Sequence, residues 1–307
     1  GAPPHYDTVE EWDGSSWTEV SEINTARSQG GAAGTTTDGL YFVGEASPGP
    51  QNVTESWNGT AWTEVADASA GAGKVADSDS SAKSAFFAGG DGPPGGAVAT
   101  TEEWSFPSTP VVQEGQLWVK TATGVDSVLK GYAQQGTGAW SSGGTMGTTR
   151  PQASPAGTQT AGLVSGGASD SANAETYDGT SWSEVANINT GRSKSVGGGT
   201  QTSAMNASGN GSPSDYENKA ETWDGSSWTE VSEINTGRNQ GGGCGASSTS
   251  TLIFGGEVSG GGTTANTESW NGSAWTEVSN LNMARTQVGG CGIATSALAG
   301  SGHPGSG

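Results

Sequence analysis

The stretch "ETWDGSSWTEV", residues 221–231, decides the fold because the chain carries it in five near-copies. The others are "EEWDGSSWTEV" from residue 10, "ESWNGTAWTEV" from 55, "ETYDGTSWSEV" from 175 and "ESWNGSAWTEV" from 268. Each has Asp-Gly or Asn-Gly at its centre, and these dipeptides favour tight hairpins because glycine accepts a positive φ. The sequence therefore predicts a repeated β-hairpin with an aromatic residue on either side of its turn.

The second aromatic residue of each copy sets the period. Together with one further tryptophan it gives a series spaced mostly 42 to 47 residues apart: Trp17, Trp62, Trp140, Trp182, Trp228 and Trp275. A period in the forties with Trp and Gly is typical of propellers with one four-stranded blade per repeat. In residues 234–278 the strands are predicted at "QGGGCGA", "STLIFGG", "NTESW" and "SAWTEV". Since Gly, Ser and Thr offer little apolar area, the tryptophans are expected to fill the space between neighbouring sheets.

An arginine follows each hairpin at an equivalent place: Arg27, Arg150, Arg192, Arg238 and Arg285. Equivalent cations could grip an anion together, or each could bond the carbonyl groups of its own loop. The structural interpretation is favoured. One unit has Ala72 at this place, which would interrupt an anion-binding ring.

The two ends of the chain are predicted to share one blade. The C-terminal unit "RTQVGGCGIATSALAGSG" supplies two strands without a hairpin, and "YDTVEEWDGSSWTEV" near the N-terminus supplies a hairpin with nothing before it. Joining them removes open sheet edges. We therefore expect one domain over residues 1–307, an all-β, six-bladed propeller, and trimming either end should unfold more than a tail.

One interval is longer than the rest. Trp62 and Trp140 are 78 positions apart, about 33 more than one period. Within the extra segment, residues 111–135 alternate apolar and polar side chains around "TATG" and predict an inserted β-hairpin. Its Trp118, Lys120, Lys130 and Tyr132 suggest a docking element for a partner. A flap packed on the side of the propeller is the equal alternative.

Charge and composition limit the partners. The formal net charge of −20 repels phosphate backbones, so nucleic acid is not expected. The sequence has no apolar run of the roughly 18 residues that span a bilayer, and membrane insertion is not expected. The two cysteines, Cys244 and Cys291, occupy equivalent places and are interpreted as small buried residues.

The repeat resembles the kelch family, in which a Gly pair, an aromatic-Asp pair, a Trp and an Arg recur. In this chain these are "LIFGG" from Leu252, "WDG" from Trp223, then Trp228 and Arg238. The pattern departs from the family at Gly44 and around residues 205–209, where irregular blades are expected. More narrowly, the "SSWTEV…NTGR" style and the insertion resemble kelch-like proteins of tailed bacteriophages of aquatic bacteria. That resemblance implies a virion component, with virion proteins and a host surface glycan or receptor as partners.

Catalytic chemistry finds little support in the residues. The kelch family includes copper oxidases, whose site needs His, Tyr and Cys, yet this chain has only two histidines. His5 and His303 are expected to meet beside Asp7 without forming a metal site. We expect no enzyme activity and no cofactor. The alternative to a virion component is a free carbohydrate-binding propeller, extracellular or cytoplasmic.

Overall fold

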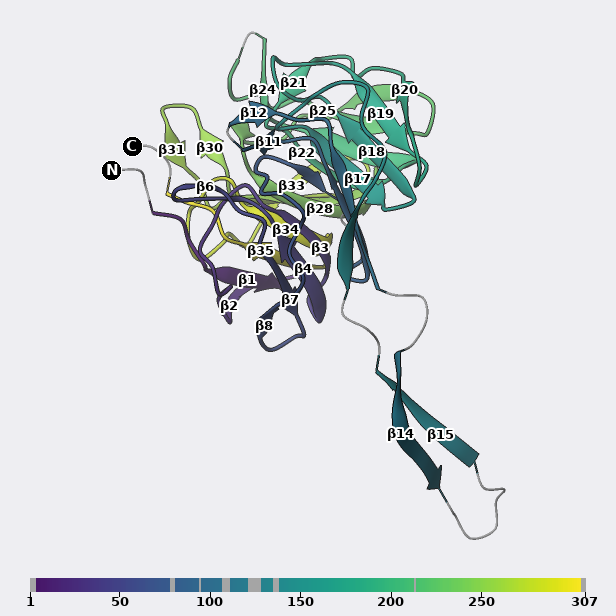
Figure 1. Cartoon of the computed structure of the whole chain (residues 1–307). Coiled ribbons are helices and arrows are strands. Elements are labelled where there is room, and N and C mark those ends of the chain that lie inside the picture. The colour runs from purple at the N-terminus through teal and green to yellow at the C-terminus, as the bar shows by residue number, and fades with distance from the viewer. Residues whose placement is uncertain are drawn as a thin grey trace.

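The computed structural model describes residues 4–77, 81–93, 95–106, 111–120, 128–134, 138–212 and 214–304, with the backbone alone for 111–120 and 128–134. This part of the chain is built from strands and contains no helix. Figure 1 shows short strands gathered in a rounded body, from which the pair β14 (Val111–Lys120) and β15 (Val128–Gln134) stands apart.

The body contains six four-stranded antiparallel sheets, each ordered from an innermost strand to an outermost one. Two are β34 (Gly289–Ile293), β35 (Ser296–Gly300), β1 (Val9–Trp12), β2 (Trp17–Val20); and β3 (Gly31–Thr35), β4 (Asp38–Phe42), β7 (Thr54–Trp57), β8 (Trp62–Glu64). Two more are β9 (Ala76–Asp77), β10 (Ser84–Ala88), β13 (Thr101–Ser105), β16 (Ala139–Ser142); and β17 (Ser154–Thr158), β18 (Ala161–Ser165), β19 (Ala174–Tyr177), β20 (Trp182–Val185). The last two are β22 (Val196–Thr200), β23 (Ser203–Ala207), β25 (Ala220–Trp223), β26 (Trp228–Val231); and β28 (Gly242–Ser247), β29 (Ser250–Phe254), β32 (Thr267–Trp270), β33 (Trp275–Val278).

The innermost strands face one another around a common axis. Neighbouring contacts run from β34 to β3, β9, β17, β22, β28 and back to β34. Strands from the two ends of the chain share one sheet, where Val9 lies opposite Gly300 and Trp12 opposite Ala297. The repeated sheets and their arrangement are consistent with a β-propeller.

The repeated motif forms the outer hairpin of five sheets. In one copy Trp223 lies opposite Trp228, and Gly225 in the turn has a φ of 93°. The carboxylate of Asp224 accepts hydrogen bonds from the backbone N–H groups of Ser226 and Ser227, each at 2.8 Å. The Ser226 hydroxyl also donates to this carboxylate, at 2.7 Å. The hydroxyl bond first, and then the two backbone bonds, lower the pKa of Asp224 to about 2. The Asp-Gly signal therefore predicted the place of the turn and the positive φ of its glycine.

Six apolar clusters fill the spaces between neighbouring sheets. In one of them Leu40 and Phe42 meet Phe87 and Trp104 of the next sheet. The predicted tryptophans take part in this packing, with Trp17, Trp228 and Trp275 buried and Trp62, Trp140 and Trp182 half-buried. Each lies 4.8 to 5.6 Å from the other aromatic ring of its hairpin.

The expected irregularity near Gly44 and residues 205–209 was wrong. Both sheets concerned have four ordered strands. Val43 and Ser208 adopt φ angles of 50° and 60°, so they take the left-handed conformation that glycine takes at the same place in other sheets, as at Gly255.

Short ribbons cover one end of the body. They are β5 (Glu45–Ala46), β6 (Gly49–Pro50), β11 (Asp91–Gly92), β12 (Gly96–Ala97), β21 (Arg192–Ser193), β24 (Asn210–Gly211), β27 (Arg238–Asn239), β30 (Glu257–Val258) and β31 (Gly262–Thr263). β21 pairs with β24 and β27 with β30, so the arginine segments and the long loops share one face. The insertion leaves β13 at Ser105, the opposite end of that strand from the loop before Thr101. We call the ribbon-bearing end the loop face.

Candidate functional site

Buried ion pairs lie between the arginine segments of the loop face and the sheets. The five predicted arginines are each 0 to 1% exposed. Each pairs with the glutamate that begins a copy of the repeated motif: Arg27 with Glu55, Arg150 with Glu175, Arg192 with Glu221, Arg238 with Glu268, and Arg285 with Glu10. Their guanidinium groups are therefore neutralised inside the protein and are not arranged around an anion.

The pair of Arg238 and Glu268 illustrates the geometry. Arg238 Nη2 lies 2.5 Å from Glu268 Oε1, and Arg238 Nη1 donates to the carbonyl groups of Gly255 and Asn266 at 3.1 and 2.7 Å. Glu268 Oε2 accepts from the backbone N–H of Asn235 at 2.7 Å. Each pair therefore ties an arginine segment to the third strand of a sheet. The predicted carbonyl bonds are present, but the carboxylate partner was not predicted.

The unit with Ala72 in place of arginine keeps its buried carboxylate. Glu102 is 6% exposed and accepts two hydrogen bonds from Ser69, at 2.9 Å from the backbone N–H and 2.6 Å from the hydroxyl. The hydroxyl therefore takes the place of a guanidinium donor. This substitution makes the β9 sheet locally different from the other five.

Two residues after each arginine position, the backbone forms a closed ring of hydrogen bonds. Its members have φ angles of 54° to 64° and are Gln29, Lys74, Gln152, Lys194, Gln240 and Gln287. Each N–H donates to the carbonyl of the neighbouring member at 2.7 to 3.2 Å, and Gln29 donates to Gln287 to complete the circuit. We call this set the six-residue ring. Left-handed residues other than glycine carry strain, which proteins concentrate at functional sites.

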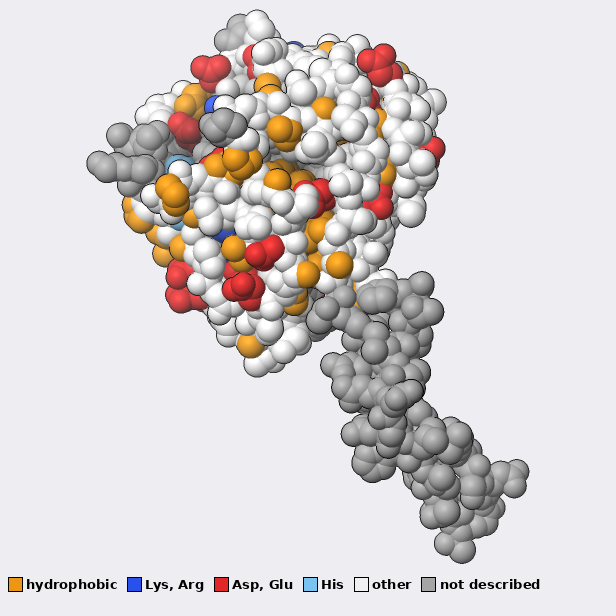
Figure 2. All heavy atoms as spheres, in the orientation of Figure 1, with side chains coloured by type: hydrophobic (Ala, Val, Ile, Leu, Met, Phe, Trp, Pro, Cys, Tyr) orange, Lys and Arg blue, Asp and Glu red, His pale blue; other side chains and the backbone are white. Residues whose placement is uncertain are grey.

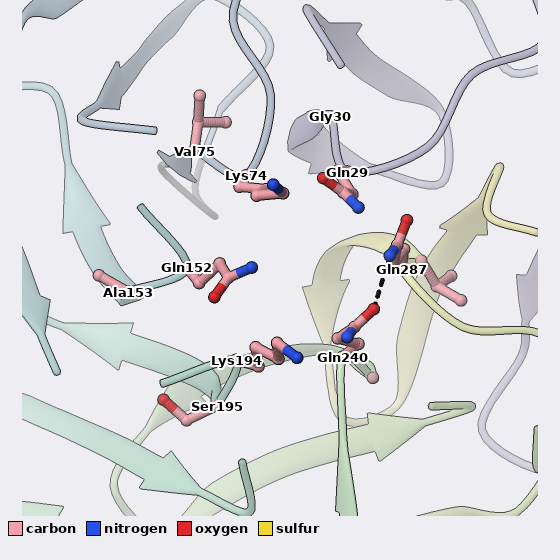
Figure 3. A pocket seen from close by; sticks show the side chains of 12 residues that line it. Gln29, Gly30, Lys74, Val75, Gln152, Ala153, Lys194, Ser195, Gln240 and Gln287 are labelled. Atoms are coloured by element: carbon pink, nitrogen blue, oxygen red, sulfur yellow. Dashed lines mark hydrogen bonds between the residues drawn. The ribbon is translucent and has the colours of Figure 1, made fainter. Parts of the chain in front are cut away.

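The side chains of the six-residue ring line a cavity of about 120 Å³ at the loop face. Figure 3 shows the four glutamine and two lysine side chains arranged around it. Gln287 Nε2 donates to Gln240 Oε1 at 2.6 Å, and Lys74 Nζ pairs with Asp91 at 2.7 Å. Four carboxamides and two ammonium groups therefore meet on the axis of an acidic protein. We call this space the ring cavity.

A second cavity of about 110 Å³ adjoins the ring cavity and contains Asp77. The equivalent position of the other units is Ala32, Pro155, Gly197, Gly243 or Gly290. Asp77 Oδ2 accepts a hydrogen bond from the backbone N–H of Ala32, which joins the inner strands β9 and β3. Burial raises the pKa of Asp77 to about 7. This carboxyl group therefore breaks the symmetry of the axis.

Asp77→Asn is expected to raise the free energy of unfolding at about pH 8 by about 2 kcal/mol. In the unfolded chain Asp77 ionises near its ordinary pKa of 3.8, whereas in the folded protein it does so near 7. The free energy of unfolding of the wild type therefore falls as pH rises from about 4 to about 7, by at most about 4 kcal/mol. We expect about half of this maximum because water in the adjoining cavity partly solvates the carboxylate. Tyr41 is the other ionisable group influenced by this carboxylate.

Urea unfolding between about pH 5 and about pH 8 measures this effect. Asparagine keeps an oxygen that accepts from Ala32, so the advantage of the variant should shrink as pH falls toward 4. Glu277→Gln, on the exposed side of β33, is the control and should follow the wild type. A pH-independent difference between Asp77→Asn and the wild type would contradict the raised pKa.

The predicted docking residues lie on the inserted hairpin. Trp118 pairs with Lys130 in the backbone register, Lys120 ends β14, and Tyr132 lies in β15. The hairpin predicted for residues 111–135 is therefore present in the backbone between Val111 and Gln134. Residue 135 and the side chains of these four residues lie outside the described part of the structure, so their docking role stays a prediction.

The histidines and cysteines fall where the sequence placed them. The rings of His5 and His303 are 6.4 Å apart, with His5 Nδ1 3.1 Å from the Ser28 hydroxyl. Cys244 and Cys291 are buried thiols on inner strands and are not joined by a disulfide. Among the described residues, no group of three or more His, Cys, Asp or Glu side chains could hold a metal ion. The same residues include no helix that could cross a membrane.

Comparison with known proteins supports the architecture. A solved structure titled "Structure of YjhT" matches with a TM-score of 0.62 and 16% identity, covering 85% of this chain and 87% of that one. The likeness is one of fold. No family model matches the sequence, and no curated protein matches it. Function must therefore be argued from the residues of this chain.

Proposed function

We propose that this protein is a six-bladed, kelch-like propeller that serves as a non-enzymatic structural or recognition part of a larger assembly, a tailed-bacteriophage virion. The hairpin β14–β15, which stands away from the body in Figure 1, is the observation that carries an assembly role. The circuit of inner strands and the six-residue ring support six blades closed by the sheet that the chain ends share.

In this proposal the two ends of the propeller have different tasks. The inserted hairpin anchors the chain to other virion proteins, because a hairpin that stands apart from the body offers strand edges for pairing with another chain. The loop face meets a host surface glycan or receptor. Figure 2 shows acidic side chains over the visible surface with little Lys or Arg between them, which keeps such a body from binding nucleic acid or anionic surfaces.

Deleting residues 111–135 is expected to leave a folded propeller that no longer joins its assembly. Ser105 and Ala139 already pair, so the remaining residues close a turn between β13 and β16. The melting temperature should change by less than about 4 °C, corresponding to less than about 1 kcal/mol for a chain of this size. Co-sedimentation of the tagged chain with particles measures incorporation.

A matched control shortens a loop on the opposite face. Deleting residues 259–261, between β30 and β31, should leave incorporation unchanged because this ribbon belongs to the loop face. Normal incorporation of the 111–135 deletion would overturn the anchoring role. A wild-type chain that stays free of particles would overturn the virion assignment.

The alternative function is that of a free carbohydrate-binding propeller. The amide-lined ring cavity favours it, since carboxamides both donate to and accept from hydroxyl groups. The repeat tryptophans do not, because their rings pack between sheets. Binding of the isolated chain to a glycan array, lost when Gln152 is replaced with Ala, would favour this alternative over the virion role.

A further inference from the structure

We propose that the ring cavity binds a small oxyanion, the carboxylate, sulfate or phosphate group of a ligand, with Lys194 as its principal charge partner. The proposal concerns a site on the loop face that the anchoring hairpin does not use, and it stands or falls separately from the anchoring role.

The two lysines are not needed to build the six-residue ring. The ring is held by backbone N–H and C=O groups, and four of its six members are glutamines in the same left-handed conformation. A glutamine at position 74 or 194 would satisfy the same backbone geometry. Placing an ammonium group in a partly enclosed cavity costs desolvation free energy that glutamine avoids. A lysine in the ring that has no carboxylate partner therefore points to a ligand and not to folding.

Lys194 is the cation that remains available. Lys74 Nζ already pairs with Asp91 at 2.7 Å and also interacts with Glu45, whose pKa is raised mainly by burial. Over the described part of the chain, no carboxylate lies within 4.0 Å of Lys194 Nζ. The protein has a net charge of −20, so an ammonium group on the axis without a carboxylate partner runs against its overall charge.

The surrounding amides complete an anion site. Gln29 Oε1 is buried without a hydrogen-bond partner among the described residues, and Gln152 extends its amide toward the centre in Figure 3. A side-chain amide can present its NH₂ group once a ligand oxygen is available. The volume of about 120 Å³ holds roughly four water molecules, enough for a tetrahedral or planar oxyanion.

Isothermal titration calorimetry with sulfate, phosphate, citrate and neutral glucose tests the site and separates the ligand sources. We expect one anion per chain with a Kd of about 1 mM or tighter at low salt, and no heat with glucose. Lys194→Gln should weaken anion binding at least about tenfold, since charge-assisted bonds are the strong ones. This variant repeats the residue found at four equivalent positions, so it should fold normally.

The matched control is Lys83→Gln, which makes the same change in net charge at a lysine that is 61% exposed and outside the cavity. It should bind within about twofold of the wild type, and Lys194→Arg within about threefold. The proposal is overturned if none of the three anions binds the wild type at about 10 mM, or if Lys194→Gln binds them as the wild type does.

Discussion

Glu268→Gln is expected to lower the free energy of unfolding by about 3 to 5 kcal/mol. The change removes the counter-charge from Arg238, whose side chain is 0% exposed, and leaves a guanidinium in the interior that is still bonded to two carbonyl groups. Burial lowers the pKa of Arg238, and Glu268 acts in the opposite direction. Loss of the carboxylate therefore exposes the full cost of burying the cation.

A double-mutant cycle separates the energy of the Arg238–Glu268 ion pair from the effect of changing the size of the side chains. Arg238→Met alone should cost a similar amount, whereas Arg238→Met with Glu268→Gln should cost less than either change alone, because no unpaired charge remains. Glu22→Gln, at an exposed carboxylate that takes no part in the pair, is the control and should lie within about 0.5 kcal/mol of the wild type. Urea unfolding followed by tryptophan fluorescence supplies the values, and additive effects in the double variant would contradict buried pairing.

Deleting residues 1–20 is expected to abolish cooperative folding at room temperature. Strands β1 and β2 supply Val9, Trp12 and Trp17 to two of the six apolar clusters. Each indole ring buries roughly 150 to 250 Å², worth about 4 to 6 kcal/mol, so the loss is comparable with the entire net stability of a typical domain. The deletion also removes Glu10 and leaves Arg285 buried without its partner.

Complementation provides the specific test of this deletion. Adding a synthetic peptide of residues 4–20 to the truncated chain should restore the thermal transition, because β1 pairs along β35 from Val9 to Trp12. A peptide with Trp12→Ala and Trp17→Ala is the control and should not restore it. Removal of residues 305–307 should leave the transition unchanged, since β35 ends at Gly300. A truncated chain that melts like the wild type would contradict the structural role of the shared sheet.

The sequence predicted the parts of the fold that depend on local chemistry. Asp224-Gly225 marks a turn because its conformation is set by neighbouring residues, and Trp228 marks the strand after it. The alternation around Trp118 likewise predicted the paired strands of the insertion.

The ion pairs were missed because their partners lie in different segments of the sheets, 25 to 30 residues apart along the chain in four of the five cases. A signal was present: every copy of the motif begins with glutamate, and this position, unlike Glu277 on the outer strand, is fully buried. A glutamate that recurs on the apolar side of a strand needs a cation. The recurring arginines were the candidates.

The ring cavity was not predicted because its charged groups stand at positions where this chain's units differ from one another. Lys74, Lys194 and Asp77 occupy places where other units have glutamine or small residues. Superposing the units position by position would have singled them out. Only the arrangement around a common axis shows that the departures at three places along the chain meet in adjoining cavities.

The sheet made from both ends of the chain also affects how molecules can exchange parts. The hairpin sequence from residue 10 differs from that at 221–231 at one position, Glu11 in place of Thr222. Nothing covalent ties β1 to β35, so in a concentrated refolding mixture the N-terminal hairpin of one molecule can complete the sheet of another. Such exchange preserves every native contact while linking two chains, and its extent depends on concentration in a way that the folding of a single chain does not.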